Sequence, residues 1–186
     1  MLSKRTTPPG MAEPLTARAR EIVVSARELL DEHGADALTM RGLAERLGIR
    51  APSLYKHLPD KAALEVAVIA TGLEDLAVAL EHARHAVAEP TVALATAYRA
   101  FALTHPHLYL LMTNRPLARE HLPAGVEDRA AAPVLEAIGS LALARAFWAF
   151  AHGMVLLELA GRFPPDADLD TAWHAGIDAF RKAAAP

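Results

Sequence analysis

The stretch that decides the fold lies at residues 39–68 and reads TMRGLAERLGIRAPSLYKHLPDKAALEVAV. Its apolar residues recur three and four positions apart, which is the spacing of one face of a helix. Thr39 can serve as the N-cap of a short helix that Gly48 ends, because its hydroxyl accepts a free backbone N–H. Pro52 fits only the first turn of a helix, so a second helix is expected from there to about His57.

The second short helix has one polar side. Its apolar face is centred on Leu54, and the side chains of Pro52, Ser53 and Lys56 point the opposite way. Tyr55 lies between the two faces. Two short helices joined by a tight turn, with the polar side of the second exposed, fit a helix-turn-helix. In that motif the second helix enters the major groove of DNA.

Helical spacing continues on both sides of this stretch. Thr16 can cap a first helix that stops at Gly34, and Asp60 can cap a helix that continues to about Arg84. No segment alternates as a half-buried strand would. The sequence therefore predicts an all-α fold of about nine helices, and the remaining ones are expected at about 91–104, 106–113, 126–139, 141–161 and 169–184.

Length and composition restrict the class of protein. A chain of 186 residues has room for one globular unit and a small appended module, and a hydrophobic fraction of 53% is ample for a core. The sequence has no cysteine, which excludes a disulfide framework, thiolate catalysis and Cys-ligated metal centres. The net charge is −3, yet residues 39–61 hold two acidic side chains against five basic ones: Arg41, Arg46, Arg50, Lys56 and Lys61. A local excess of positive charge of this kind is typical of a surface that binds the phosphates of nucleic acid.

Two features bear on the cellular compartment. The first ten residues, MLSKRTTPPG, contain two cations but no apolar core, so they do not read as a secretory signal. The longest apolar run, residues 146–157, is bounded by Arg145 and Glu158, and its twelve residues are too few to cross a bilayer. We therefore expect a cytoplasmic protein without a membrane partner.

The helix-turn-helix segment carries a recognisable pattern. It joins T-x-R-x-L-A, L-G-I, S-L-Y-x-H and D-K-x-x-L, and it is preceded by AREIVVSARELLDEHG at residues 19–34. Over residues 16 to about 68 the chain closely resembles the DNA-binding domain of the TetR/AcrR family of bacterial transcriptional regulators. A second resemblance involves HPHLYLLM at 105–112 and FWAFAHGMVLLELAGRF at 147–163. It is to the C-terminal type of that family marked by Trp, His and Gly (WHG), here Trp148, His152 and Gly153.

The resemblance implies an operator-binding surface. Thr39 would touch a phosphate, although it can equally be a plain N-cap, and Arg50 could reach either backbone or base. Tyr55 has packing against the first helix as its alternative role. The residues expected to face double-stranded DNA are Thr39, Arg41, Arg50, Pro52, Ser53, Tyr55, Lys56, His57 and Lys61.

The polar, Pro- and Gly-containing composition of the first 14 residues and the family resemblance together predict a domain plan. We expect a flexible tail at 1–14, the helix-turn-helix domain at 15–62, and a ligand-binding and dimerisation domain at 63–186. The helices at 141–161 and 169–184 are apolar over more of their circumference than surface helices should be, so a homodimer is expected.

Aromatic and polar side chains of the C-terminal half form a candidate effector site, and ordinary core packing is an equal alternative. These side chains are mostly apolar and carry a few polar atoms, which predicts a small, largely hydrophobic effector. The six candidates are Phe101, His105, Tyr109, Met112, Trp148 and His152.

Other classes of function find less support. The nine histidines include pairs such as His82 and His85, but no metal-binding motif accompanies them, so no metal is expected. A phosphate-binding glycine loop and a nucleophile elbow are both lacking, which predicts neither an enzyme nor a cofactor. The expected function is a ligand-responsive repressor that binds a palindromic operator. The alternatives are a helical small-molecule carrier or enzyme with a vestigial helix-turn-helix, and a structural DNA binder that responds to no ligand.

Overall fold

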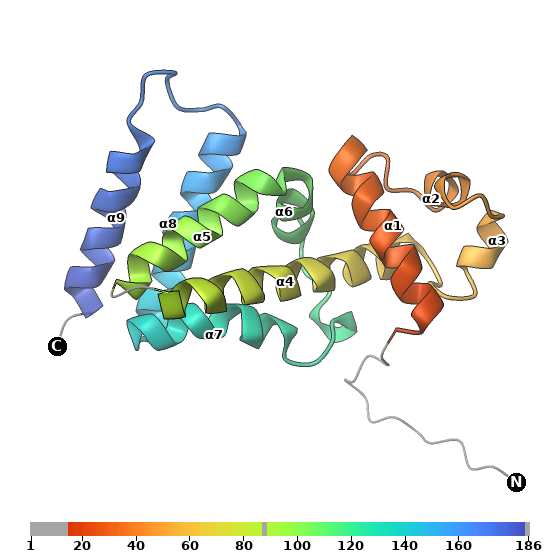
Figure 1. Ribbon diagram of the computed structural model, residues 1–186, viewed down its shortest axis with the longest axis horizontal. Coiled ribbons are helices and arrows are strands. Elements are labelled where there is room, and N and C mark those ends of the chain that lie inside the picture. The colour runs from red at the N-terminus through yellow and green to blue at the C-terminus, as the bar shows by residue number, and fades with distance from the viewer. Residues whose placement is uncertain (1–14, 87–88, 185–186) are drawn as a thin grey trace, which may run out of the picture. The chain divides into compact units, whose positions relative to one another are not determined.

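The computed structural model of the chain describes residues 15–86 and 89–184 (Figure 1). The tail predicted at 1–14 lies outside the described residues. Within them the chain forms nine α-helices and one short 3-10 helix, and no strand. The predicted all-α fold is therefore confirmed.

The predicted caps begin the first helices. Helix α1 spans Ala17–His33, and the side chain of Thr16 accepts the N–H of Ala19 at 3.2 Å. Helix α2 spans Met40–Arg46 and α4 spans Lys61–Ala86. Asp60 Oδ1 accepts the N–H of Ala63 at 2.8 Å at the start of α4. Each cap satisfies a backbone donor that the helix itself leaves free.

Helix α3 spans only Ala51–Leu54, so the prediction that it continues to about His57 is wrong. The N–H groups of His57 and Leu58 both donate to the carbonyl of Leu54, at 2.9 Å, and close a turn there. Leu58 precedes Pro59, and a residue before proline is disfavoured in the helical conformation. The chain leaves the helix and still buries Leu58, which is 3% exposed.

The later helices begin and end within two residues of the predicted positions. Helix α5 meets α6 at His105-Pro106, and Gly139 and Gly161, with φ of 74° and 60°, follow the ends of α7 and α8. The bounds are Pro90–Thr104 for α5, Pro106–Thr113 for α6, Val126–Ile138 for α7, Leu141–Leu159 for α8 and Leu169–Ala184 for α9, with the 3-10 helix η1 at Arg119–His121.

The described residues form two compact units. The first combines the chain up to Leu73 with His107–Val126, and the second combines Glu74–Pro106 with the chain from Glu127 onward. In the first unit, α4 and α6 approach closely: a Cβ on Gly72 would lie 2.6 Å from Met112 Sδ. A functional boundary between residues 62 and 63 remains a prediction.

The second unit is a helical bundle in which α8 packs against α5 and α9. Its core includes Phe147 and Val155 of α8 and Trp173 of α9, each at most 3% exposed. A Cβ on Gly176 of α9 would overlap the ring of Phe150, so glycine is needed where α8 and α9 meet. The bundle is thus closely packed on one side of α8.

Helix α8 is longer than the apolar run at residues 146–157. Its 19 residues have a mean hydropathy of 1.3 over an 18-residue window, so by length and composition it could cross a membrane. The helix also carries Glu158, whose side chain is 7% exposed and paired with Arg99. Only 22% of that window is buried, which leaves an apolar face of α8 uncovered in the single chain.

Candidate nucleic-acid interface

All nine residues predicted to face DNA lie in the first unit. Leu43 of α2 and Leu54 of α3 are fully buried, and this inward packing leaves the opposite sides of both helices outside. Thr39, Ser53 and Lys61 are half-buried. The other six are exposed: Arg41, Arg50, Pro52, Tyr55, Lys56 and His57.

Thr39 caps α2. Its hydroxyl oxygen accepts the N–H of Gly42 at 3.0 Å, as one of its two predicted roles requires. The hydroxyl proton is still available to donate, so the cap and a phosphate contact are compatible. The phosphate contact itself remains a prediction.

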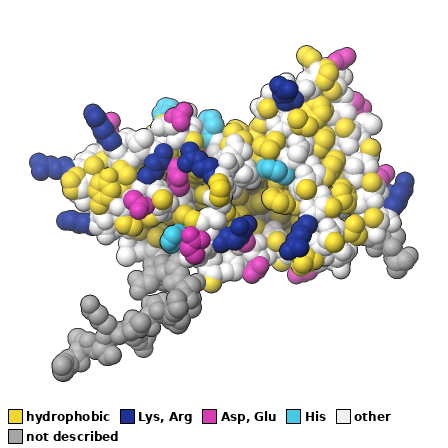
Figure 2. All heavy atoms as spheres, turned by 180° about the vertical axis from the view of Figure 1, so that it is seen from behind, with side chains coloured by type: hydrophobic (Ala, Val, Ile, Leu, Met, Phe, Trp, Pro, Cys, Tyr) yellow, Lys and Arg dark blue, Asp and Glu magenta, His cyan; other side chains and the backbone are white. Residues whose placement is uncertain are grey.

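The cations of this surface differ in how they are paired. Arg41 Nε lies 3.0 Å from Glu45 Oε1, and Lys61 Nζ lies 3.4 Å from Glu65 Oε1. Arg50 and Lys56 have no acidic partner among the described residues. Figure 2 shows Lys and Arg side chains projecting from the part of the molecule that holds α2 and α3. Exposed ion pairs contribute little free energy, so a phosphate can replace the carboxylate partner of Arg41.

Arg46 has a different role from the other basic residues of this segment. Its guanidinium donates to Glu32 at 2.7 and 2.8 Å and to Glu28 at 3.2 Å, and it thereby joins α2 to α1. Hydrogen bonds to Glu32 and then Glu28 raise the pKa of Arg46, and the same pairing lowers the pKa of Glu32. Arg46 therefore orients α2 rather than adding to the free positive charge. No local pattern predicts this pairing, because the partners are 14 and 18 residues away in the sequence.

Helix α6 and the loop after it contact α1 and α4 within the first unit. His107 Nδ1 lies 3.1 Å from the carbonyl oxygen of Asp31 near the end of α1. Arg115 Nη1 lies 3.4 Å from Glu65 Oε1, the carboxylate that also pairs with Lys61. These contacts connect residues beyond the predicted DNA-binding domain to the surface that it presents.

The six residues predicted to line an effector site fall into three groups. Phe101 and His105 are in ring contact, with centroids 5.4 Å apart, in the second unit. The rings of Trp148 and His152 stack at 5.7 Å in the same unit, and burial lowers the pKa of His152. Trp148 is nevertheless 53% exposed. The last group, Tyr109 and Met112, belongs to the first unit.

A groove between α4 and α5 contains the first of these groups. Its volume is about 590 Å³ and it is open to solvent. Phe101 and His105 line it, and none of the other four predicted residues does. The remaining lining is mostly small or apolar: Val78, Ala79, His82, Ala83, Ala97, Ala100 and Thr104.

Both halves of the chain match known families. Residues 22–68 match the family model described as bacterial regulatory proteins, tetR family, and residues 91–180 match the model described as a tetracyclin repressor-like C-terminal domain. The first match covers the helix-turn-helix. The second covers α5 and most of the helices after it.

Relatives and solved structures agree with these matches. The uncharacterized HTH-type transcriptional regulator Rv0681 of Mycobacterium tuberculosis is 34% identical in an alignment of 173 residues that covers 87% of this chain and 78% of that protein. Tetracycline repressor protein class D of Escherichia coli is 54% identical over 46 residues, 24% of this chain and 21% of that protein. The structure of a protein with unknown function from Rhodococcus sp. RHA1 aligns with a TM-score of 0.72 and 28% identity, covering 94% of this chain and 98% of that one.

Proposed function

Because the chain belongs to the TetR family of bacterial regulatory proteins, and is therefore a DNA-binding transcriptional regulator, we propose that it is a ligand-responsive repressor. It binds a palindromic operator in double-stranded DNA as a homodimer. The observation that carries the proposal is the exposed surface of the helix-turn-helix, where Arg50 and Lys56 have no acidic partner among the described residues and flank the polar side of α3. Such a surface offers positive charge to phosphates and hydrogen bonds to base edges.

The nine surface residues divide by chemistry. The cations Arg41, Arg50, Lys56 and Lys61 neutralise phosphates, which supplies affinity without much sequence choice. Ser53 can donate to or accept from a base edge in the major groove, so it is the residue to which we assign sequence choice. The contact with the DNA backbone and the major groove is completed by the other four residues: Thr39, Pro52, Tyr55 and His57.

Replacing Ser53 with Ala is expected to relax sequence choice at one position of each half-site. A lost base contact is worth about 1 to 3 kcal/mol of discrimination, or roughly 5- to 150-fold in relative affinity. The measurement is selection from random double-stranded DNA, followed by titration of single-base variants of the enriched site. Ser25→Ala, the same change on a half-buried position of α1, is the matched control and should leave the preference intact. Failure of the wild-type protein to enrich any palindrome would overturn the repressor proposal.

The effector proposal is supported by the groove between α4 and α5. Its apolar walls and the histidines His82 and His105 fit a small, largely hydrophobic molecule with one or two polar atoms. An effector changes operator affinity only if it binds two conformations unequally. Two elements can carry that change to the DNA-binding helices: α4, which begins at Lys61 and continues into the second unit, and α6, through His107 and Arg115.

Filling the groove is expected to abolish the effector response while operator binding remains. Ala100→Phe places an aromatic ring among the lining residues, so a hydrophobic compound found by thermal-shift screening should no longer raise the melting temperature. In the wild type that compound should change operator affinity by about 5- to 150-fold. Ala183→Phe, on an exposed position of α9 outside the groove, should respond as the wild type does. If Ala100→Phe also responds normally, the effector binds elsewhere.

Three further expectations belong to the same proposal. The C-terminal half is of the type marked by Trp148, His152 and Gly153. A repressor of this kind has no catalytic residues and no cofactor, and it acts in the cytoplasm because its operator is there. An assay that found turnover of a bound small molecule would contradict the repressor proposal and favour the alternative of a helical carrier or enzyme.

A further inference from the structure

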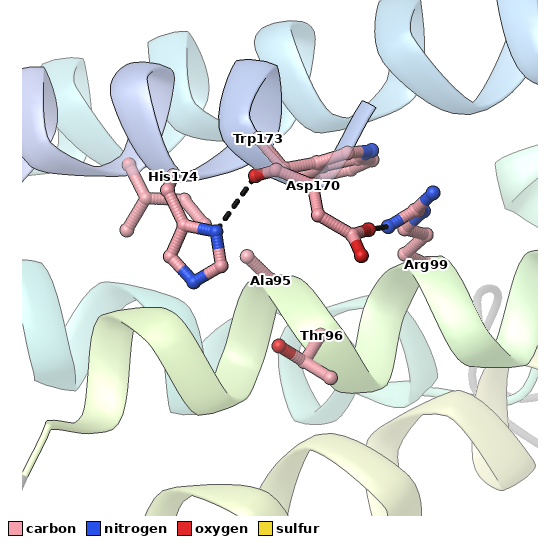
Figure 3. Close-up of a pocket in the computed structure, with 7 residues that line it drawn as sticks. Ala95, Thr96, Arg99, Asp170, Trp173 and His174 are labelled. Carbon is pink, nitrogen blue, oxygen red and sulfur yellow. Dashed lines mark hydrogen bonds and ion pairs between the residues drawn. The ribbon is translucent and has the colours of Figure 1, made fainter. Parts of the chain in front are cut away.

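A second cavity lies inside the second unit, between α5 and the start of α9 (Figure 3). Its volume is about 230 Å³, and it shares no residue with the groove described above or with the predicted effector set. Helix α5 contributes Ala95, Thr96 and Arg99, and α9 contributes Asp170, Trp173, His174 and Ile177. The cavity is therefore distinct from the groove between α4 and α5.

A buried carboxylate holds one wall of this cavity in place. Glu158 of α8 accepts Arg99 Nε at 3.0 Å and Trp173 Nε1 at 2.6 Å, and its side chain is only 7% exposed. Arg99 Nη1 continues to Asp170 Oδ1 at 2.6 Å, and its guanidinium carbon lies 5.6 Å from the centre of the Trp173 ring. Burial opposes the charge on Arg99, but hydrogen bonds to Asp170 and Glu158 outweigh it and raise the pKa. This wall is therefore rigid and permanently charged.

Apart from two N–H groups of Arg99, the polar groups that remain available in this cavity are acceptors. Thr96 donates its hydroxyl proton to the carbonyl of Val92 at 2.9 Å, which leaves its oxygen lone pairs free. His174 Nδ1 lies 2.7 Å from the carbonyl of Asp170, so Nδ1 carries the proton and Nε2 of the neutral ring accepts. Asp170 uses Oδ1 for Arg99, and its side chain is 78% exposed, so Oδ2 is accessible. Figure 3 shows Asp170 and His174 directed from α9 toward Ala95 and Thr96 of α5.

The charges around the cavity also favour a ligand that donates hydrogen bonds. One cation, Arg99, stands against two carboxylates, Glu158 and Asp170, so these three groups carry one net negative charge. Three of the five N–H groups of Arg99 are already engaged with these carboxylates. A ligand that brings hydrogen-bond donors and a positive charge is therefore favoured over an anion.

The remaining lining is apolar and sets the size of the ligand. Ala95, Ile177 and the ring of Trp173 are each at most 3% exposed and form the non-polar wall. A volume of about 230 Å³ is below the range of roughly 300 to 1,000 Å³ typical of drug-sized ligands. We propose that this cavity is a binding site for a small primary ammonium compound, with the ammonium group between Asp170 Oδ2, Thr96 Oγ1 and His174 Nε2 and a short apolar body against Ile177.

The test uses three probes of one shape and different charge: 2-phenylethylammonium, 2-phenylethanol and phenylacetate. Binding to the full chain is followed by protein-observed NMR titration up to 20 mM at pH 7.5, where the first probe is charged. The ammonium probe is expected to bind at least about tenfold more tightly than the alcohol, because a charge-assisted hydrogen bond is lost in the alcohol, and the carboxylate is expected to bind weakest.

Three variants locate the site. Asp170→Asn is expected to weaken ammonium binding about tenfold, whereas Asp178→Asn removes the same charge from α9 outside the cavity and should change it less than twofold. Thr96→Val deletes one acceptor but keeps the Arg99–Asp170 pair, so it remains informative if Asp170→Asn disturbs folding; a loss of about threefold or more is expected. Equal affinity for the three probes, no binding at 20 mM, or ammonium binding unchanged in both Asp170→Asn and Thr96→Val would each overturn the proposal. Operator binding is not used as a readout, so the result is independent of the proposed repressor function.

Discussion

Raising the salt concentration from 50 to 200 mM is expected to weaken operator binding about ten-thousand-fold. Each protomer presents Arg41, Arg50, Lys56 and Lys61 on the predicted DNA-binding surface, so the proposed dimer presents twice that set. Every phosphate that a cation neutralises releases condensed counterions, with a slope of about −0.9 per contact in a plot of log affinity against log salt. A slope near −7 is therefore expected, measured by fluorescence anisotropy with the selected operator.

The charge variants make this prediction specific to the interface. Arg50→Gln together with Lys56→Gln should reduce the slope to about half, because the two changes remove two of the four cations that each protomer presents. The matched control is Arg162→Gln with Lys182→Gln, which removes the same charge from the second unit. A control slope that falls as far as the interface slope would mean that the net charge of the protein, and not this surface, determines binding.

A glutamate pair on α8 is expected to convert the dimer to monomers and to weaken operator binding at least about a thousand-fold. Leu141 and Leu157 are 53% and 43% exposed in the single chain, on a helix whose window is only 22% buried. Figure 2 shows hydrophobic side chains over the part of the molecule that holds α8 and α9. If a second copy covers this face, Leu141→Glu and Leu157→Glu bury unpaired charges, each costing about 3 to 5 kcal/mol. A monomer also loses the second half-site of a palindrome.

The measurement is multi-angle light scattering at micromolar concentration, alongside operator titration. Leu103→Glu is the matched control, because Leu103 is 41% exposed but lies on α5. The control should remain a dimer and bind the operator normally. A double variant that stays dimeric would show that α8 does not form the interface, and a monomeric wild type would refute the dimer altogether.

The starts of the helices could be predicted because a helix cap depends on neighbours in the sequence. Thr16, Thr39 and Asp60 cap the helices that they were expected to cap, through bonds to N–H groups three residues away. The end of α3 was misplaced because burial of Leu58 before Pro59 outweighed the helical spacing. Local pattern therefore predicts where helices start better than where a short one stops.

Pairings between distant residues could not be predicted in this way. Arg46 counts as one more cation in the sequence, but in the structure it is held by two carboxylates of α1. Likewise, Arg99 meets Glu158 and Asp170 across separations of 59 and 71 residues, and only their packing forms the second cavity. Charge and side-chain type can be read from the sequence, whereas the partner of each charge depends on the tertiary fold.

The shortness of α3 has a consequence for how the protein meets DNA. A single helical turn contributes little stability of its own, so Leu54 and Leu58 anchor this segment, and residues 55–57 lie in a turn that the N–H groups of His57 and Leu58 close on the carbonyl of Leu54. The amide protons of Tyr55 and Lys56 should therefore exchange with solvent rapidly in the free protein and become protected on the operator. Part of the conformational entropy of recognition is then lost only on binding, which makes the complex tolerant of imperfect half-sites at some expense in affinity.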